Sequence, residues 1–460
     1  MKMALCKRGK TAPGFDKGRH TMKLEQIQLT SFRGIHRMTL SLQPQMNVLV
    51  GLNGAGKSSV LDAVAILLTR VVSLIRSGKN SGKNIADSDI SAGMPFSHIQ
   101  AILSDSGQKY AWSLHRTLPP HKKNSEWDQL PPETLPLREY TAGIREEIEK
   151  TWEKCNIPIL VYYRAERVAL NFPRFVHTDR KFTLLSVFED ALSSKADYRV
   201  LLEWFREREN AEDREIKQLV MEQNGSPIQT EINPLNYRDK SLEVVRQAWQ
   251  AFMPEFSHFT IQVNPLRLEA TKNGTPFRVD QLSDGEKSLL ALVGDMARRL
   301  AIANPELENP LLGEGVILID EIDLHFHPKR QQMIVPRLME TFPNCQFLVA
   351  THSPQILGNV YADSIFLLAE DEDGIVHLRR PEESYGMTTD QILEDVMQVP
   401  AREESEEKKL LKVFELIERR KLAEAKKLIE EIRVYRKSEP KLLAADARIQ
   451  CLETLGKKPS

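Results

Sequence analysis

The sequence is poor in cysteine and has almost no excess of charge. Its 460 residues include four cysteines, which are far apart and form neither a C-x-x-C pair nor a Cys/His cluster at zinc spacing, so a structural zinc is not expected. Lys plus Arg (63) nearly equal Asp plus Glu (64), and the net charge of -1 excludes a generally basic nucleic-acid coat. Any contact with DNA must therefore be confined to a local patch.

Long apolar runs are missing as well. No uninterrupted apolar stretch approaches the roughly 20 residues that span a bilayer. The N-terminus is basic, but Thr-Ala-Pro-Gly at 11–14 stands where an export signal would have its apolar segment. We expect a cytoplasmic protein in a reducing compartment, without membrane contact.

The composition is that of a folded protein, with 41% hydrophobic and 28% charged residues. The chain is roughly three times the usual domain size, which favours one large core or two lobes. Changes in composition and periodicity divide it into five segments. We expect a basic flexible tail (1–21), an N-terminal lobe (22–183), a helical lobe or insertion (184–256), a C-terminal lobe (257–400) and a helical tail (401–460).

The last segment, 401–460, has apolar residues at helical spacing among dense charge. This pattern predicts two or three short amphipathic helices whose apolar stripe must be buried somewhere. Two alternatives remain open at this point: the helices cap the main domain, or they dock a partner.

The strongest chemical signal lies between a predicted strand and a predicted helix. Residues 51–58 read Gly-Leu-Asn-Gly-Ala-Gly-Lys-Ser and match G-x-x-x-x-G-K-S in full. Backbone N–H groups of such a loop face phosphates, the lysine reaches the terminal phosphates and the serine hydroxyl ligates Mg²⁺. We predict binding of ATP and Mg²⁺, with Ser58 as a metal ligand and with contacts from Asn53, Gly54, Ala55, Gly56, Lys57, Ser58 and Ser59.

A second signal is a buried strand at 316–319 that ends in two carboxylates. Asp320 suits Mg²⁺, and Glu321 is placed to orient the water that attacks the γ-phosphate, so it is the predicted catalytic residue. An apolar run before Asp-Glu is common by itself. It becomes informative about 260 residues after a complete phosphate loop.

A third signal is the sequence Gln-Leu-Ser-Asp-Gly-Glu-Lys at 281–287, which precedes a predicted helix. Ser283 and Glu286 fit a capping box, and by itself the segment is most simply a helix cap. The order of the three motifs, followed by 323–328 and by Thr-His-Ser-Pro at 351–354, resembles the ATP-binding-cassette ATPases. The resemblance implies that Ser283, Asp284 and Gly285 of one subunit close over the nucleotide held by another, and that His352 is the catalytic switch that senses the γ-phosphate.

The segment Ser-Phe-Arg-Gly at 31–34 resembles the Asn-Phe-Arg element of the RecF, Rad50 and SMC branch. The resemblance implies that Arg33 lies near the nucleotide phosphates, and that the fold is α/β: an ABC-type, RecF/SMC-like, two-lobed P-loop ATPase head with a helical insertion and a short helical tail. It also accounts for His325 and His327 better than an H-x-H metal pair does.

The pattern departs from the family in two places. Asp284 replaces the first glycine of the usual signature, and no Q-loop glutamine is identified between 70 and 170, which leaves one Mg²⁺ ligand unassigned. Both departures bear on the efficiency of hydrolysis.

Several branches of the family are excluded by what the chain does not contain. We expect no coiled-coil arms, because the segment 184–256 is too short and irregular for them, and no Toprim nuclease domain, because about 60 helical residues follow Arg402 here. The acidic segment 371–374 has the look of a hairpin turn and is not taken as a two-metal centre. We expect no nuclease chemistry in this chain.

Three segments, 162–167, 320–328 and 384–393, together resemble the ATPase subunit of the Septu anti-phage defence system. Retron-associated ATPases share these sequence motifs. The resemblance covers residues 22–400. It implies a small HNH nuclease partner, homo-oligomers built from ATPase-head dimers, and DNA reached through the complex. The predicted function is an ATP-binding and hydrolysing sensor that scaffolds and regulates a separate nuclease. The alternatives are a RecF-like DNA-repair ATPase that clamps on duplex DNA, and a transporter ATPase.

Overall fold

The computed structural model describes residues 21–119, 135–152, 154–165, 180–193, 199–225, 237–263, 266–371, 374–399, 404–436 and 440–456. The predicted basic tail, 1–21, lies outside these residues except for Thr21. The chain forms two compact units, Met1–Gly386 and Met387–Ser460.

A six-stranded sheet forms the centre of the first unit, in the order β13-β12-β3-β11-β10-β6. It is parallel except for β13 at one edge. Every residue of β3, β6, β10 and β11 is buried, as expected where both faces of a parallel sheet are covered. The register aligns the carboxyl ends of these four strands. The bounds are β3 (Met46–Val50), β6 (Ile159–Tyr163), β10 (Gly315–Ile319), β11 (Cys345–Thr351), β12 (Ile365–Glu370) and β13 (Val376–Arg379).

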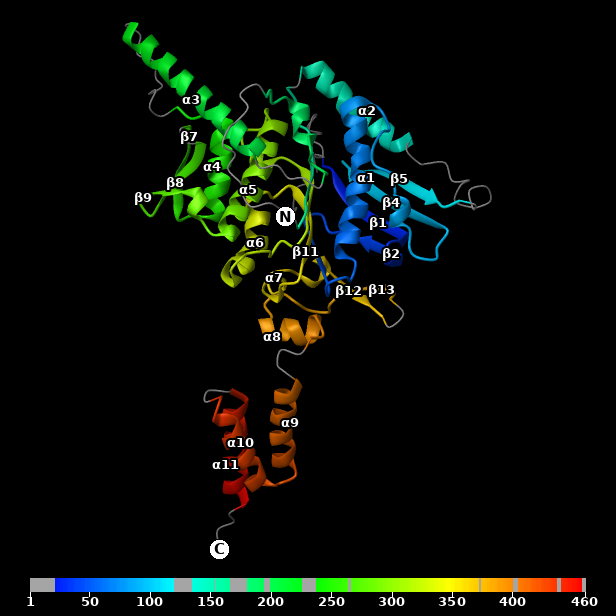
Figure 1. Cartoon of the computed structure of the whole chain (residues 1–460), viewed down its shortest axis with the longest axis vertical. Helices are drawn as coiled ribbons and strands as arrows, with labels where there is room; N and C mark the ends of the chain where they lie inside the picture. Colours follow the sequence, from blue (N-terminus) through cyan, green and yellow to red (C-terminus); the bar gives the residue numbers. More distant parts are fainter. Residues whose placement is uncertain are drawn as a thin grey trace, which may run out of the picture. The chain divides into compact units, whose positions relative to one another are not determined.

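An antiparallel sheet in the order β2-β1-β4-β5 packs on α1 (Lys57–Ser77), and α2 (Leu135–Thr151) packs on α1 and β5 (Figure 1). Trp112 ties the layers together, because its Nε1 donates to the Leu67 carbonyl oxygen at 3.2 Å. Within the described residues α1 is the one helix long and apolar enough to cross a membrane, but 67% of that stretch is buried in the protein, which is typical of a core helix. The strands are β1 (Lys23–Phe32), β2 (Ile35–Ser41), β4 (Phe96–Asp105) and β5 (Gln108–Thr117).

The described part of the segment 184–256 is mainly helical, and a small antiparallel sheet in the order β7-β8-β9 follows it (Figure 1, green). Trp249 of α4 joins it to α5, since its Nε1 donates to the Leu290 carbonyl oxygen at 2.8 Å. Gly294 of α5 lies under this ring, and a Cβ there would come within 2.7 Å of the indole nitrogen. The elements are η4 (Leu184–Phe188), α3 (Arg199–Gly225), α4 (Lys240–Phe252), β7 (Phe256–Val263), β8 (Leu266–Lys272), β9 (Thr275–Arg278), η6 (Val279–Gln281) and α5 (Asp284–Ala303).

The remaining elements of the first unit surround the main sheet. The bounds are η1 (Asp87–Asp89), η7 (Pro310–Leu312), α6 (Pro328–Thr341), α7 (Pro354–Leu357) and η8 (Ala362–Ser364). The α6 helix follows the loop after β10, and α7 follows the loop after β11, so both begin where the parallel strands end.

The second unit begins with a short helical segment, α8 (Thr389–Gln391) and the π-helix η9 (Ile392–Val396), and continues with α9 (Glu404–Glu418), α10 (Leu422–Arg433) and α11 (Pro440–Gly456) (Figure 1, orange to red). The last three helices bury their apolar stripes against one another. The buried cluster consists of Leu410, Val413, Ile417, Ala425, Ile429, Ile432, Leu442, Ala445 and Ile449. The sequence did not determine what buries the apolar stripe of the tail. In the structure the three tail helices bury it against one another.

Candidate nucleotide-binding site

The glycine-rich loop joins the buried strand β3 to α1, in the context that the motif requires. Gly54 and Gly56 have φ of 87° and 90°, which glycine adopts without strain. A Cβ on Gly51 would lie 2.4 Å from the Leu368 carbonyl oxygen of β12, so the loop can pack there only with glycine. The loop curls tightly and presents exposed backbone at Asn53 and Gly54.

Lys57 opens α1, and its side chain folds back over the loop. The Nζ group donates to the carbonyl oxygens of Gly51 and Leu52, each at 2.9 Å. Burial lowers the pKa of Lys57, and the charges of Asp320 and Glu321 act in the opposite direction. The lysine is therefore held in the electric field of the acidic pair predicted to serve the same site.

Asp320 and Glu321 follow β10 directly. The Asp320 N–H donates to the Tyr163 carbonyl oxygen at 2.8 Å, which anchors the acid at the sheet edge. Its Oδ1 is buried and has no hydrogen-bond partner in the part of the chain that the structure describes. A buried carboxylate oxygen of this kind suits a cation or a cation-bound water. Glu321 has φ 45°, a strained conformation that turns the chain sharply after the strand.

The loop after β10 is fastened to the loop after β11. The Ile322 N–H donates to the Ala350 carbonyl oxygen at 3.0 Å, and the Thr351 hydroxyl donates to the Asp323 carboxylate. His352 comes next, and burial together with the charge of Lys57 lowers its pKa. The imidazole is consequently neutral near pH 7.

The predicted signature segment caps α5, and its capping box is present. Ser283 Oγ accepts from the Glu286 N–H at 3.3 Å, and the Glu286 carboxylate accepts from the Ser283 N–H at 3.1 Å. Ser283 and Asp284 are exposed. A Cβ on Gly285 would lie 2.2 Å from the His325 carbonyl oxygen, so glycine lets the signature pack against the loop after β10. Among the described residues, no hydrogen bond joins Ser283 to the phosphate loop of the same chain; its side chain bonds to Glu286.

Arg33 lies beside the start of α1. Its Nη1 donates to Asp62 at 2.6 Å and its Nε to Asp89 at 2.9 Å. Burial acts to lower the pKa of Arg33, but these two carboxylates outweigh it and raise the pKa. Asp62 is one helical turn after Ser58, so the arginine is close to the predicted phosphate site without pointing at the loop in this structure.

Arg164 and Asp62 were not predicted as site residues. Tyr163 ends β6 opposite Ile319 of β10, so the next residue, Arg164, emerges beside Asp320. Arg164 Nη2 lies 2.7 Å from Asp62 Oδ1. A glutamine was expected in this part of the chain, whereas the available signal is an arginine directly after a buried strand.

The residue types and their arrangement fit a nucleotide with a divalent cation. Three features lie together at one edge of the sheet. They are the exposed backbone of the loop, the close packing that admits only glycine at Gly51, and the buried Asp320 oxygen that has no hydrogen-bond partner among the described residues. His327, the second histidine of the H-x-H pair, instead caps α6 through its ring nitrogen.

Comparison with known proteins agrees with this architecture. The RecF/RecN/SMC N terminal domain matches residues 23–377. The chain belongs to this family. It is an ATPase head of the RecF/SMC type, and the fold class predicted from the sequence is confirmed.

Two retron proteins resemble the chain over most of its length. The Retron Ec83 probable ATPase of Escherichia coli is 29% identical over 433 residues, 83% of this chain and 77% of the relative. The Retron Vc95 probable ATPase of Vibrio cholerae serotype O1 biovar El Tor is 31% identical over 389 residues, 76% of this chain and 74% of the relative. The Septu protein PtuA of Bacillus thuringiensis is 33% identical over 134 residues, 28% of this chain and 34% of the relative. The chain is thus a PtuA-like ATPase.

Solved structures of the same class include the SMC head bound to the C-winged helix domain of ScpA. The match covers 78% of the present chain and 97% of the SMC head, with 15% identity and a TM-score of 0.41. The SMC head domain from Thermotoga maritima covers 78% and 99%, with 12% identity and a TM-score of 0.38.

Proposed function

We propose that the chain is the ATP-binding and hydrolysing sensor subunit of a bacterial anti-phage defence complex, which acts in the cytoplasm and controls a separate HNH-type nuclease. The observation that supports this most is the meeting of Lys57, Asp320, Glu321 and His352 at one sheet edge in a chain similar to retron and Septu ATPases.

The proposed chemistry is hydrolysis of the γ-phosphate. The backbone N–H groups of 53–59 and Lys57 bind the phosphates, and Ser58 with Asp320 would hold Mg²⁺, which supplies charge neutralisation. Glu321 orients a water and takes its proton as the water attacks phosphorus and the bond to the leaving ADP oxygen breaks. Neutral His352 has one ring N–H available to donate to the γ-phosphate.

We further propose a composite site between two copies. Ser283, Asp284 and the N–H of Gly285 lie at the N-terminus of α5, which has 20 residues, and a helix of this length favours an anion at its start. The exposure of Ser283 and Asp284 supports contact with a nucleotide held by a second copy rather than by the same chain.

The cutting activity is assigned to the partner, and the tail, about residues 403–456, is proposed to dock it. Although the tail buries its stripe internally, Leu411, Val434 and Leu443 are 55–81% exposed and could contact a partner. The nuclease would bring DNA to the complex.

The test combines tail deletion with a nuclease assay. Removing 403–456 should abolish binding of the nuclease subunit and leave ATP binding by the head intact. DNA cleavage by the chain without a co-purifying subunit, surviving Asp320→Ala and Glu321→Ala, would show that the assignment is wrong.

A RecF-like repair ATPase is the second candidate, favoured by one observation. DNA replication and repair protein RecF of Pseudomonas putida (strain W619) is 50% identical over 46 residues, which is 10% of this chain. ATP-dependent binding of the purified chain alone to duplex DNA, without a nuclease subunit, would favour this alternative.

A further inference from the structure

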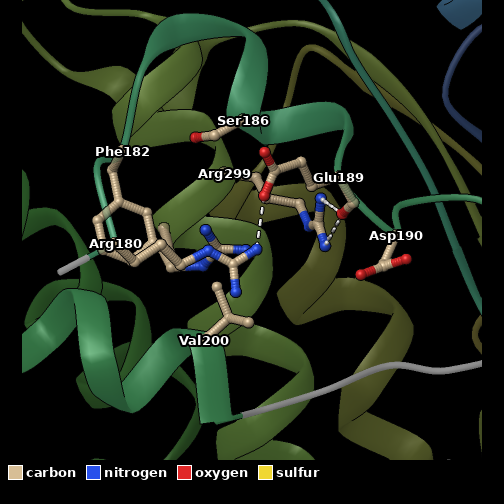
Figure 2. Close-up of a pocket in the computed structure, with 8 residues that line it drawn as sticks. Arg180, Phe182, Ser186, Glu189, Asp190, Val200 and Arg299 are labelled. Atoms are coloured by element: carbon tan, nitrogen blue, oxygen red, sulfur yellow. Dashed lines mark hydrogen bonds and ion pairs between the residues drawn. The ribbon is translucent and has the colours of Figure 1, made fainter. Parts of the chain in front are cut away.

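A small pocket lies away from the nucleotide site, between η4, the start of α3 and α5 (Figure 2). Three arginines line it: Arg298 and Arg299 from α5, and Arg180 from the segment before η4. The free space at its centre is about 20 Å³, which is room for one or two water-sized groups. An occupant can therefore insert only an end group.

The buried charges at this pocket do not balance. Arg298 and Arg299 have side chains only 2% and 9% exposed, and both pair with the single carboxylate of Asp295, which is 8% exposed. Arg299 also donates to the carbonyl oxygens of Val187 and Glu189. One positive charge is left over in a region where water does little to screen it.

Arg298 is the arginine that this arrangement leaves under-compensated. Its Nε and Nη2 both donate to one oxygen, Asp295 Oδ1, at 3.1 and 2.6 Å, while Arg299 takes the other oxygen, Oδ2, at 2.7 Å. Burial lowers the pKa of Arg298 in spite of Asp295, whereas the pKa of Arg299 is raised because Asp295 outweighs its burial. An additional anion would stabilise the charged form of Arg298.

Two further acids line the pocket and must be weighed. Glu189 is paired with Arg180 at 2.5 Å (Figure 2), so these two charges cancel, and Arg180 can offer an anion its N–H groups while the excess charge is that of Arg298. Asp190 is exposed, and water and salt therefore weaken its repulsion of an incoming anion. The buried guanidinium of Arg298 dominates the field at the centre.

We propose that this pocket is a second ligand site, which binds a phosphate group of a small molecule through Arg298 and Arg180. The guanidinium N–H groups donate to the phosphate oxygens that enter the pocket, and the rest of the ligand stays outside. Ser186 and Phe182 complete the wall (Figure 2).

The pocket is connected to the nucleotide site by a short buried chain of hydrogen bonds. The Tyr163 hydroxyl donates to Asp295 at 2.9 Å, and the Tyr163 carbonyl oxygen accepts from the Asp320 N–H. A ligand that shifts Arg298 therefore also shifts Asp295 and Tyr163, and Tyr163 anchors Asp320. We expect its binding to change the rate of ATP hydrolysis.

The test is titration of inorganic phosphate into the full chain carrying Lys57→Ala, so that binding of the probe at the phosphate loop is weakened and the binding that Arg298→Met removes is that of the pocket. Calorimetry should show one saturable site, lost in Arg298→Met and weakened about tenfold in Arg180→Met. Arg299 still neutralises Asp295 in the first variant, and Arg180 is one-third exposed, so the second variant does not threaten folding.

Arg70→Met is the matched control, because Arg70 is also a buried arginine but lies on α1, outside this pocket. It should leave phosphate binding unchanged. Equal binding in all three arginine variants, or no saturation at tens of millimolar phosphate, would overturn the proposal. Acetate binding as tightly as phosphate would overturn the assignment to phosphate. Because the background lacks Lys57, the outcome is independent of the proposed function of the ATP site.

Discussion

Lys57 is the residue on which nucleotide binding depends most. In Lys57→Ala a triphosphate loses its principal side-chain cation while the backbone cradle remains. Charge-assisted contacts are worth about 1.5–3 kcal/mol each, so we expect the ATP dissociation constant to rise about 10- to 100-fold. Calorimetry measures this directly. Lys83→Ala, an exposed lysine outside the phosphate loop, is the control, and unchanged affinity in Lys57→Ala would contradict the site.

Asp62 lies one helical turn beyond Ser58 and forms ion pairs with both Arg33 and Arg164. In Asp62→Asn both arginines lose an ionic partner close to the proposed phosphate site. We expect the maximal rate of ATP hydrolysis to fall severalfold with little change in melting temperature, because both arginines are partly exposed. Arg164→Gln should reproduce the effect on rate, and Arg116→Gln, which removes an exposed ion pair with Asp87, should not. Equal rates in Asp62→Asn and the unaltered protein would argue against a role in positioning.

At the scale of elements, α3 meets β7 through a carboxyl group with a raised pKa. Burial raises the pKa of Glu209 to about 7, while its carboxylate accepts from the Ile261 N–H at 2.9 Å. The folded state therefore binds a proton that the unfolded state releases near pH 4.5. The stability from this proton is present below pH 4.5 and is lost as pH rises through 7.

Glu209→Gln keeps an acceptor for Ile261 and removes the titration. It should stabilise the protein at pH 8 by about 1–3 kcal/mol relative to its effect at pH 5. Thermal unfolding at the two pH values measures the difference. A shift in melting temperature that is equal at both would mean that the carboxyl group titrates normally.

The N-terminus of α5 and the turn after β10 belong together in the composite-site proposal. Glu321→Gln keeps the shape of the site but loses the carboxylate that orients water, so it should retain ATP and hydrolyse it at least tenfold more slowly. Trapped ATP should then hold two copies together, and Ser283→Arg should prevent this. Light scattering that finds monomers in every nucleotide state would rule out the composite site.

At the scale of the whole molecule, the three tail helices have their own buried cluster. A tail that covers its own stripe does not need the head for that burial, so deleting it should leave the melting temperature of the head within a few degrees of the full chain. Differential scanning calorimetry tests this, with nucleotide binding as the control for an intact head. Aggregation of the shortened chain would mean that the tail covers the head after all.

The phosphate loop and the acidic pair could be predicted from the sequence, because adjacent residues determine their local structure. A strand, a glycine turn at Gly54 and Gly56, and a helix opening at Lys57 specify their geometry by backbone preference alone. The capping box of Ser283 is local for the same reason. The family resemblance then supplied the order of the motifs and the fold class.

The pair of Arg164 with Asp62 and the hydrogen bond from Tyr163 to Asp295 needed the tertiary structure, because the two partners come from distant parts of the chain. Strand register sets Arg164 beside Asp320, and no spacing in the sequence encodes which strand lies next to β10. The tail stripe is ambiguous for the same reason: periodicity says that an apolar face will be buried, whereas only packing decides what covers it. Local chemistry was thus fixed by adjacent residues, and long-range pairing by the topology of the sheet.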